Sequence, residues 1–467
     1  LNEKKAVSDV GLTVKKEKAY LKDNDEVPDV SIWNRLCNLR QYDLKYYDDI
    51  IEKIVRGEKI EYVPTEYKVY EREESSEKVR RLVSLSAKDR VITTNLALRL
   101  CSKMKINWKS FSYHISYTSQ ERIFYYWYSS WGKFIDHIRV FTEIPFMDNY
   151  EAFYIDLKGF YDHIDFVSVF RSFENFLDEE TKNIFVFLTE FNDILMKKLQ
   201  NGRRIGVPQG PAYARIIAEM FLNQLLESMC QQFKNSGFYM YRYVDDIVFF
   251  CEPDFDGKAM YDYLIGTLPS AGLPINYDKT KYFGKISSIN DEDRRELLHQ
   301  DSFNYELKEN EYTGILVEEE RRKKLKNYLM KNPFNVGSLG YIFGTNTFSE
   351  AQSWCLDYYR EDILKSCNGR GSNFRKFYEF LFKNERYMKL ILDNEELELI
   401  SLDSLNFSNF VHSLYYAVQD HVIAPSLFER IKHEYIEKLF DTKMKKDDEI
   451  IINALRLITA EVSDEKA

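Results

Sequence analysis

The sequence predicts a mixed α/β core followed by an all-helical C-terminal region. Residues 151–156 (EAFYID) have the β-branched and aromatic content of a short strand. Residues 238–251 (FYMYRYVDDIVFFC) place two aromatic-rich strands around an acidic pair, as in a tight β-hairpin. From about Glu319 onward the pattern becomes one helix after another. A strand, helices, a hairpin and a helical tail in this order indicate an α/β fold with a helical part behind it.

Length and composition describe a globular protein of two or three domains. The chain has 467 residues, of which 44% are hydrophobic and 30% charged. We expect no transmembrane span, because no stretch approaches 18 apolar residues, and no secretory segment. Six cysteines without a CxxC pair argue against zinc modules and disulfide scaffolds and favour a reducing, cytoplasmic setting. The chain starts at Leu1 rather than at Met, so whether the native N-terminus is present stays open.

The other predicted elements come from charge mixture and apolar spacing. In chain order they are an N-terminal extension of short helices and loops (1–70), an aromatic-rich helix (121–134), amphipathic helices (168–200), a break (201–210) and a further helix (212–233). These elements predict three parts: the extension over 1–70, an α/β core over 71–318, and a helical domain over 319–467 whose pattern is compatible with helical repeats.

The distribution of charge matters more than its sum. The formal net charge is −10, which does not favour a nucleic-acid binder. Residues 78–133, however, contain eleven Lys or Arg and only two acids. Local patches decide contact with phosphates, so this stretch predicts either a nucleic-acid-binding face or an ordinary solvated surface.

Three carboxylates are the candidates for chemistry. Asp156 ends the first predicted strand, and Asp245 and Asp246 occupy the hairpin tip. Phosphoryl transfer onto a 3′-hydroxyl needs two hard cations about 3.5–4 Å apart, and Mg²⁺ prefers oxygen ligands that converge from different segments. Adjacent acids between apolar strands would repel each other unless a cation compensated them. Because neighbouring strand residues point to opposite faces, we expect Asp245 to be the direct ligand and Asp246 the more peripheral one.

Six segments occur in an order that resembles a known family. They are residues 80–85 with 89–91 (RRLVSL, DRV), 154–165 (YIDLKGFYDHID), 206–211 (GVPQGP), 243–246 (YVDD), 272–280 (GLPINYDKT) and 312–314 (YTG). They resemble, respectively, the fingers motif and motifs A, B, C, D and E of reverse transcriptases. Each segment alone is weak evidence, whereas the ordered set over roughly residues 78–316 is specific. The resemblance implies the fingers and palm of a right-hand polymerase, the palm having an antiparallel sheet and helices.

The resemblance implies roles for the residues of motifs A, C and D. Asp156, Asp245 and Asp246 would be catalytic and would hold two Mg²⁺ ions, which Mn²⁺ can replace. Tyr161, five residues after Asp156, takes the steric-gate position, where its ring would crowd a ribose 2′-hydroxyl and favour deoxynucleotides; the alternative is an ordinary core tyrosine. Lys279 would protonate the leaving pyrophosphate, or it is simply an exposed loop lysine.

Motif B and the fingers motif imply the remaining nucleotide contacts. Gln209 and Gly210 would shape the pocket for the nucleotide and the template base, since glycine lets backbone come close. Arg80 would bind the incoming triphosphate, because a planar guanidinium suits bidentate phosphate contact. Lys78 and Arg90 are weaker candidates for the same contact.

Departures from the common pattern point to a subclass. After motif B most members carry Ser and Pro, whereas residues 211–222 read PAYARIIAEMFL and resemble the abortive-infection and other defence-associated bacterial reverse transcriptases. In those enzymes a helical region replaces the thumb and helps to form oligomers. The resemblance implies phage defence, deoxynucleoside triphosphates as substrates, a DNA product, self-association and no membrane partner. Synthesis would be untemplated and primed from a tyrosine, or would copy a noncoding RNA.

Two other classes stay open. An RNA-dependent RNA polymerase shares the palm acids, although Tyr161 and the fingers motif count against it. A non-catalytic scaffold built on a palm is disfavoured because nothing forces a scaffold to keep three costly acids. Neither an acidic quartet of the RNase H type nor an HNH-like Cys/His cluster occurs in the tail.

Overall fold

The computed structural model describes residues 9–298 apart from short gaps, together with parts of the chain beyond them. The gaps are 24–28, 66, 76–77, 105–109, 117–120, 126, 175–176, 201, 203 and 234–236; beyond 298 the described residues are 343, 349–366, 372–399, 410–411, 413–415, 417–418 and 423–437. The chain forms two compact units. The first comprises Leu1–Asp25, Leu36–Val69 and Val83–Asp301, and the second comprises Glu26–Arg35, Tyr70–Leu82 and Ser302–Ala467.

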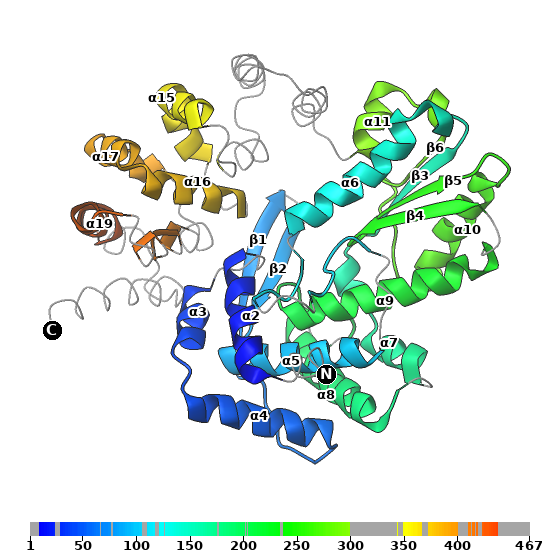
Figure 1. Ribbon diagram of the computed structural model, residues 1–467, viewed down its shortest axis with the longest axis horizontal. Coiled ribbons are helices and arrows are strands. Elements are labelled where there is room, and N and C mark those ends of the chain that lie inside the picture. Colours follow the sequence, from blue (N-terminus) through cyan, green and yellow to red (C-terminus); the bar gives the residue numbers. More distant parts are fainter. Residues whose placement is uncertain are drawn as a thin grey trace. The chain divides into compact units, whose positions relative to one another are not determined.

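The first unit contains a four-stranded antiparallel sheet, which lies between α6 (Trp127–Glu143) and α10 (Gly257–Ser270) (Figure 1). Its strands are β3 (Glu151–Asp156), β4 (Phe238–Tyr243), β5 (Asp246–Cys251) and β6 (Lys281–Lys285), in the order β4-β5-β3-β6. β3 has the predicted bounds, and β4 and β5 form the predicted hairpin. The two central strands are buried almost throughout, which explains their nearly continuous apolar sequences.

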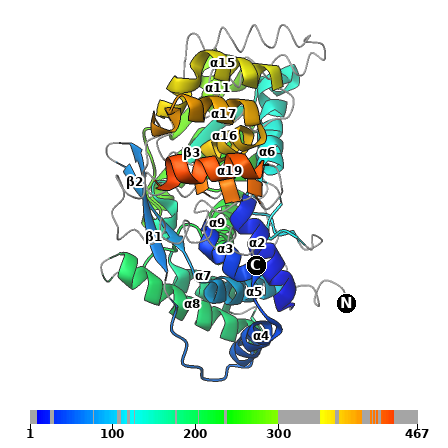
Figure 2. The same cartoon turned by 90° about the vertical axis from the view of Figure 1, so that its left-hand side faces the viewer.

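Helices and short 3-10 turns make up the rest of the first unit. They are α2 (Val10–Asp23), α4 (Gln41–Val55), α5 (Ala87–Met104), α6 (Trp127–Glu143), η1 (Pro145–Met147), η2 (Phe160–His163), α7 (Phe166–Phe173), α8 (Glu179–Leu199), α9 (Ala212–Cys230), η4 (Gln231–Phe233), α10 (Gly257–Ser270), η5 (Ile286–Ser288) and α11 (Asp291–Leu297). α7, α8 and α9 confirm the predicted helices. α5 is buried along most of its length, because α2, α4, α8 and α9 all contact it (Figure 2).

Helices cover both faces of the sheet. Phe141 of α6 stacks on Phe250 of β5 with ring centroids 4.2 Å apart. On the opposite face Tyr261 of α10 meets Phe153 of β3 edge-on at 5.5 Å. Since side chains alternate between faces along each strand, α6 covers the face that carries Phe250 and α10 covers the other.

Asp89 and Arg90 of α5 lie in the core rather than on a basic surface. Arg90 is 1% exposed, and its Nη1 lies 3.5 Å from Oε2 of the fully buried Glu17 on α2. Its Nε donates to the Leu85 carbonyl at 3.1 Å. The prediction that Arg90 is a candidate phosphate contact is therefore wrong, because its guanidinium is committed to a buried ion pair.

Two segments differ from the sequence prediction. The helix predicted over 121–134 begins only at Trp127, since the buried Phe124 pairs with Ile115 in an antiparallel bridge. The two-stranded sheet of β1 (Lys68–Ser75) and β2 (Lys78–Ser84) was not predicted, because charged residues make up most of β1 and interrupt the apolar residues of β2.

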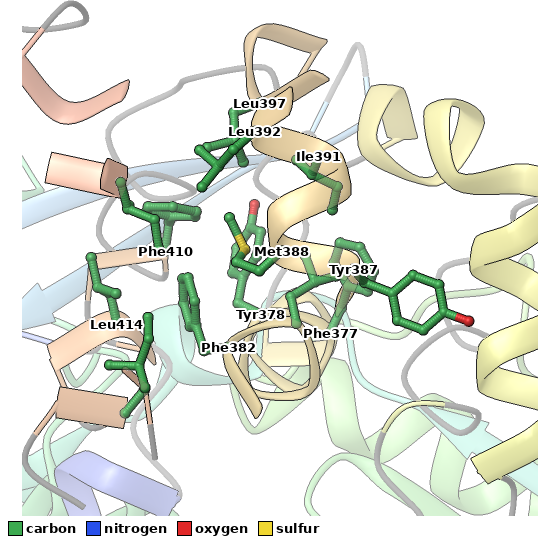
Figure 3. Close-up of a cluster of buried hydrophobic side chains, with 14 of the residues drawn as sticks. Phe377, Tyr378, Phe382, Tyr387, Met388, Ile391, Leu392, Leu397, Phe410 and Leu414 are labelled. Carbon is green, nitrogen blue, oxygen red and sulfur yellow. The ribbon is translucent and has the colours of Figure 1, made fainter. Parts of the chain in front are cut away.

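The described elements after residue 342 are helical. They are α15 (Ser349–Ser366), α16 (Ser372–Lys383), α17 (Glu385–Asp393), η7 (Glu396–Leu399), α19 (Pro425–Ile431) and the π-helical turn η8 (Lys432–Glu437); most of α3 (Val30–Cys37) also belongs to this second unit. Side chains from α16 and α17 point into one apolar cluster (Figure 3). In this cluster the rings of Tyr378 and Phe382 each lie with their centroids 5.3 Å from that of Phe410. The predicted boundaries at residues 70 and 318 stay predictions. Among the described helices, none is long and apolar enough to span a membrane.

Candidate active site

Asp156 occupies the end of β3, where the chain leaves the sheet. Its backbone N–H donates to Thr280 Oγ1 at 3.1 Å, and its carbonyl accepts from the Asn276 N–H at 2.9 Å. The loop before β6 therefore fixes the strand end from which the carboxylate projects. The Asp156 residue is 7% exposed, so few waters can solvate its charge.

Asp246 lies directly opposite Asp156. The two residues are partners in the β3–β5 ladder, so both side chains leave on the same face of the sheet. Tyr154 shares this face, being two residues before Asp156. Its hydroxyl donates to Asp246 Oδ1 and also lies 3.4 Å from Asp156 Oδ2. One phenol thus bridges two carboxylates from different segments of the chain.

All three candidate carboxylates act on this one hydroxyl. Burial raises the pKa of the Tyr154 phenol far above its usual range, and the charges of Asp246, Asp156 and Asp245 raise it further. Burial also raises the pKa of Asp246 to about 6, although the hydrogen bond from Tyr154 lowers it. Asp156 and Asp246 therefore meet at the Tyr154 hydroxyl, and the charge of Asp245 acts on the same hydroxyl from the hairpin turn.

Lys279 contributes a positive charge beside Asp156. Its Nζ lies 3.6 Å from Asp156 Oδ2, and its side chain remains mostly exposed. Its charge also lowers the pKa of Asp246. The predicted motif D lysine therefore lies beside the acids, on the loop that closes over the end of β3.

The chemistry of the donor set suits a hard divalent cation. Among the described residues, no group of three or more His, Cys, Asp or Glu is arranged as a ready-made metal site. Asp156 and Asp246 nevertheless offer carboxylate oxygens within reach of one hydroxyl. Mg²⁺ takes such oxygen ligands, usually one or two carboxylates completed by water and substrate phosphates. The buried acids thus fit a site that becomes complete with its substrate.

Tyr161 lies beside the motif B segment. Its carbonyl accepts from the Val207 N–H at 2.8 Å, and the Gly206 N–H donates to the Ile164 carbonyl at 2.9 Å. The ring of Tyr161 is half-buried and meets Phe160 edge-on at 5.5 Å. The structure therefore joins the predicted gate segment to motif B by backbone hydrogen bonds.

Gly210 is where motif B approaches the start of the fingers motif. Its φ is +123°, and a Cβ placed on it would come within 2.6 Å of the Val83 carbonyl oxygen. The Val83 N–H donates to the Gln209 carbonyl at 2.8 Å, and the Tyr20 hydroxyl donates to the Gly210 carbonyl at 2.6 Å. Close approach of backbone was predicted for this glycine; the neighbour in the structure is the chain at Val83.

Other predicted residues are placed only in part. Arg80 lies in β2, together with Lys78, and both side chains fall outside the described residues. The proposed motif E, residues 312–314, also falls outside them. Tyr154 was missed as a site residue, although its spacing of two from Asp156 in a strand is the signal that places both on one face.

Comparison with known proteins gives a family. A family model described as reverse transcriptase (RNA-dependent DNA polymerase) matches residues 73–315, just over half of the chain. Comparison with curated proteins finds no match. Among solved structures the chain is similar to telomerase from Candida albicans in complex with a TWJ fragment of telomeric RNA (13% identity, 89% of this chain and 71% of that chain, TM-score 0.31). It is also similar to apo telomerase from Candida tropicalis (13% identity, 91% and 72%, TM-score 0.37). On the family match, the chain belongs to the reverse transcriptase family.

Proposed function

We propose that this chain is a DNA polymerase that adds deoxynucleotides by two-metal nucleotidyl transfer at Asp156, Asp245 and Asp246. The meeting of Asp156 and Asp246, ladder partners on two strands, at the Tyr154 hydroxyl carries the proposal, and Asp245 precedes Asp246 directly in the hairpin turn. When bound, two Mg²⁺ ions would supply the charge that activates the attacking hydroxyl and stabilises the leaving pyrophosphate. Mn²⁺ would be able to replace them.

Residues around the acids would handle the nucleotide. Tyr161 would exclude a 2′-hydroxyl. Gln209 and Gly210 would line the base pocket, held in place by the hydrogen bond from the Val83 N–H to the Gln209 carbonyl. Lys279, 3.6 Å from Asp156, would hold a proton close to the departing pyrophosphate. Arg80 would contact the triphosphate.

The subclass is a further part of the proposal. The PAYARIIAEMFL segment and the helical elements after residue 342 support membership in the abortive-infection and defence-associated group. On that basis the chain self-associates, acts in phage defence, and either copies a noncoding RNA or works without a template.

Nucleotide incorporation by an Asp245→Asn variant tests the metal-centre proposal. Loss of one carboxylate ligand should reduce incorporation by roughly a hundredfold or more, since each tenfold corresponds to about 1.4 kcal/mol of transition-state stabilisation. Asp254→Asn, at an exposed aspartate after β5, is the matched control. Near-normal incorporation by Asp245→Asn in Mg²⁺ would exclude the metal assignment. Offering each deoxynucleotide and ribonucleotide separately distinguishes a DNA from an RNA polymerase.

A further inference from the structure

The turn that carries Asp245 and Asp246 has an unusual backbone. Only Val244 and Asp245 connect β4 to β5, and such two-residue connections favour positive φ, for which Asn or Gly is usual. Val244 has φ of +55°, which is a genuine outlier for a β-branched residue. Such a conformation persists only where the surrounding contacts determine it.

Two side chains form hydrogen bonds with the backbone N–H and the carbonyl of Val244. The Val244 N–H donates to Ser112 Oγ at 2.8 Å. Its carbonyl accepts from Arg242 Nη1, also at 2.8 Å. The first side chain comes from a segment more than a hundred residues earlier in the chain, so the turn does not define its conformation alone.

A single buried carboxylate connects these two side chains. Ser112 donates to Glu219 Oε1, and Arg242 Nη2 donates to Glu219 Oε2 at 2.6 Å. The same Arg242 nitrogen lies 2.6 Å from Oδ1 of Asn223, one turn further along α9. Ser112, Glu219 and Arg242 are each at most 1% exposed.

The buried ion pair of Glu219 and Arg242 is not explained by a contribution to stability. A buried ion pair often contributes less than an apolar replacement of the same volume, because both charges lose their hydration. What the buried hydrogen bonds among Ser112, Glu219 and Arg242 do supply is one fixed geometry. Here the fixed element is the peptide that directly precedes both hairpin carboxylates, and α9 itself follows directly after motif B.

We propose that Glu219, acting through Ser112 and Arg242, is a positioning residue that fixes the Val244 turn and so sets the affinity of the acidic site for divalent cations. The proposal rests on the metal-dependent function proposed above. None of the three side chains need touch substrate. Their effect is to direct the carboxylates that Val244 precedes.

Glu219→Gln and Ser112→Ala test this proposal, with Mn²⁺ binding measured by electron paramagnetic resonance in the absence of nucleotide. Each variant should weaken Mn²⁺ binding about tenfold, the scale typical when partners of metal ligands are removed. The Mg²⁺ concentration for half-maximal incorporation should rise by a similar factor, with a smaller change in KM for the nucleotide. Arg242→Lys should behave in the same way, because one ammonium lacks the fork that reaches Glu219, Asn223 and the Val244 carbonyl together.

Glu17→Gln is the matched control. Glu17 is another fully buried carboxylate that accepts from a hydroxyl, that of Thr94, and lies 3.5 Å from a buried guanidinium, that of Arg90. Both of these partners of Glu17 lie on α5 rather than in the hairpin turn. Glu17→Gln should reduce thermal stability without changing the Mn²⁺ affinity. If it weakens Mn²⁺ binding as much as Glu219→Gln does, the effect is general destabilisation and the proposal fails.

Val244→Gly gives a second, independent readout. Glycine adopts positive φ freely, so the turn should depend less on its hydrogen bonds to Ser112 and Arg242. Ser112→Ala should therefore reduce the Mn²⁺ affinity less in the Val244→Gly background than in the wild-type background. Strictly additive effects would overturn the positioning role.

Hydrogen exchange separates this proposal from the proposed function. Ser112→Ala should accelerate exchange of the amides at Val244 and Asp245, whether or not the protein incorporates nucleotides. Faster exchange with unchanged Mn²⁺ affinity would overturn the proposal while leaving polymerase activity intact. A wild-type protein without any incorporation would instead refute the proposed function, and the exchange and Mn²⁺ measurements would still decide the role of Glu219.

Discussion

Strand parity decides which side chains meet at the acidic site. Tyr154 and Asp156 are two residues apart on β3, and Asp246 is the ladder partner of Asp156, so all three share one face. Burial makes the two charges costly, and the Tyr154 hydroxyl and Lys279 offset part of that cost. The proposed catalytic role of these residues and the stability of the fold therefore conflict.

The conflict predicts that Asp246→Asn stabilises the metal-free protein. The pKa of Asp246 is about 6 in the fold, against about 3.9 in an unfolded chain. Between these two pH values Asp246 is therefore protonated in the folded state and ionised in the unfolded state. Above pH 6 its carboxylate is charged in both states, and burial of that charge destabilises the fold. In chelator at pH 8, Asp246→Asn should raise the free energy of unfolding by on the order of 1 kcal/mol, and by at most about 3 kcal/mol.

Urea denaturation from pH 4 to pH 8 measures this gain. The gain should shrink as pH falls through 6, because the wild-type carboxylate then becomes neutral too. A variant less stable than the wild type at pH 8 would contradict the prediction. The exposed Asp254→Asn is the control and should show no such pH dependence.

Tyr161 is predicted to select the sugar. Removal of its ring in Tyr161→Ala should raise ribonucleotide incorporation relative to deoxynucleotide incorporation, because the half-buried ring no longer crowds a 2′-hydroxyl. Tyr161→Phe keeps the ring and should keep the selectivity. Competition between each ribonucleotide and its deoxynucleotide measures the ratio, and an unchanged ratio in Tyr161→Ala would place the gate elsewhere.

At the scale of elements, motif B packs its backbone directly against the chain at Val83. Gly210 allows it, since no side chain fits between its Cα and the Val83 carbonyl. The positive φ of Gly210 adds a conformational reason for glycine. The segment that bounds the predicted nucleotide pocket is thereby fixed to the C-terminal end of β2 at Val83.

Gly210→Ala should therefore destabilise the protein by at least about 2 kcal/mol, because backbone must move to admit the methyl group. Gly266→Ala is an informative control: this glycine lies inside α10 with nothing within 4 Å of an added Cβ. It should stabilise by up to about 1 kcal/mol. Thermal or urea unfolding of both variants checks that the two changes in the free energy of unfolding have opposite signs. Equal stability of Gly210→Ala and the wild type would show that the backbone at Val83 has room for a methyl group.

At the scale of the whole molecule, the family match covers residues 73–315 and leaves the chain beyond them to other roles. The helices α16 and α17 form their own apolar cluster there, with apolar residues at spacings of three and four. A helical tail of this kind supports the subclass proposal, in which some members prime from their own tyrosine and others copy a noncoding RNA.

If that subclass is right, the purified protein should carry DNA attached covalently to a tyrosine hydroxyl. A two-metal centre activates any hydroxyl presented in line, and a phenol can take that place. The 34 tyrosines of the chain include well-exposed ones such as Tyr42 and Tyr358. Mobility on a denaturing gel should change after nuclease digestion. A band that nuclease leaves unchanged, with synthesis that requires an added oligonucleotide, would show conventional priming.

The sequence by itself determined the strand β3, the hairpin β4–β5, the helices α7 to α9 and the order of the acidic motifs, because periodicity and turn chemistry are local properties. It also indicated Gly210 as a point of close approach. Tertiary structure alone decided that Tyr154 bridges Asp156 and Asp246, that Arg90 pairs with Glu17, and that Glu219 reaches the hairpin turn. Alternation places a side chain on a face, but only packing decides which distant residue it meets there.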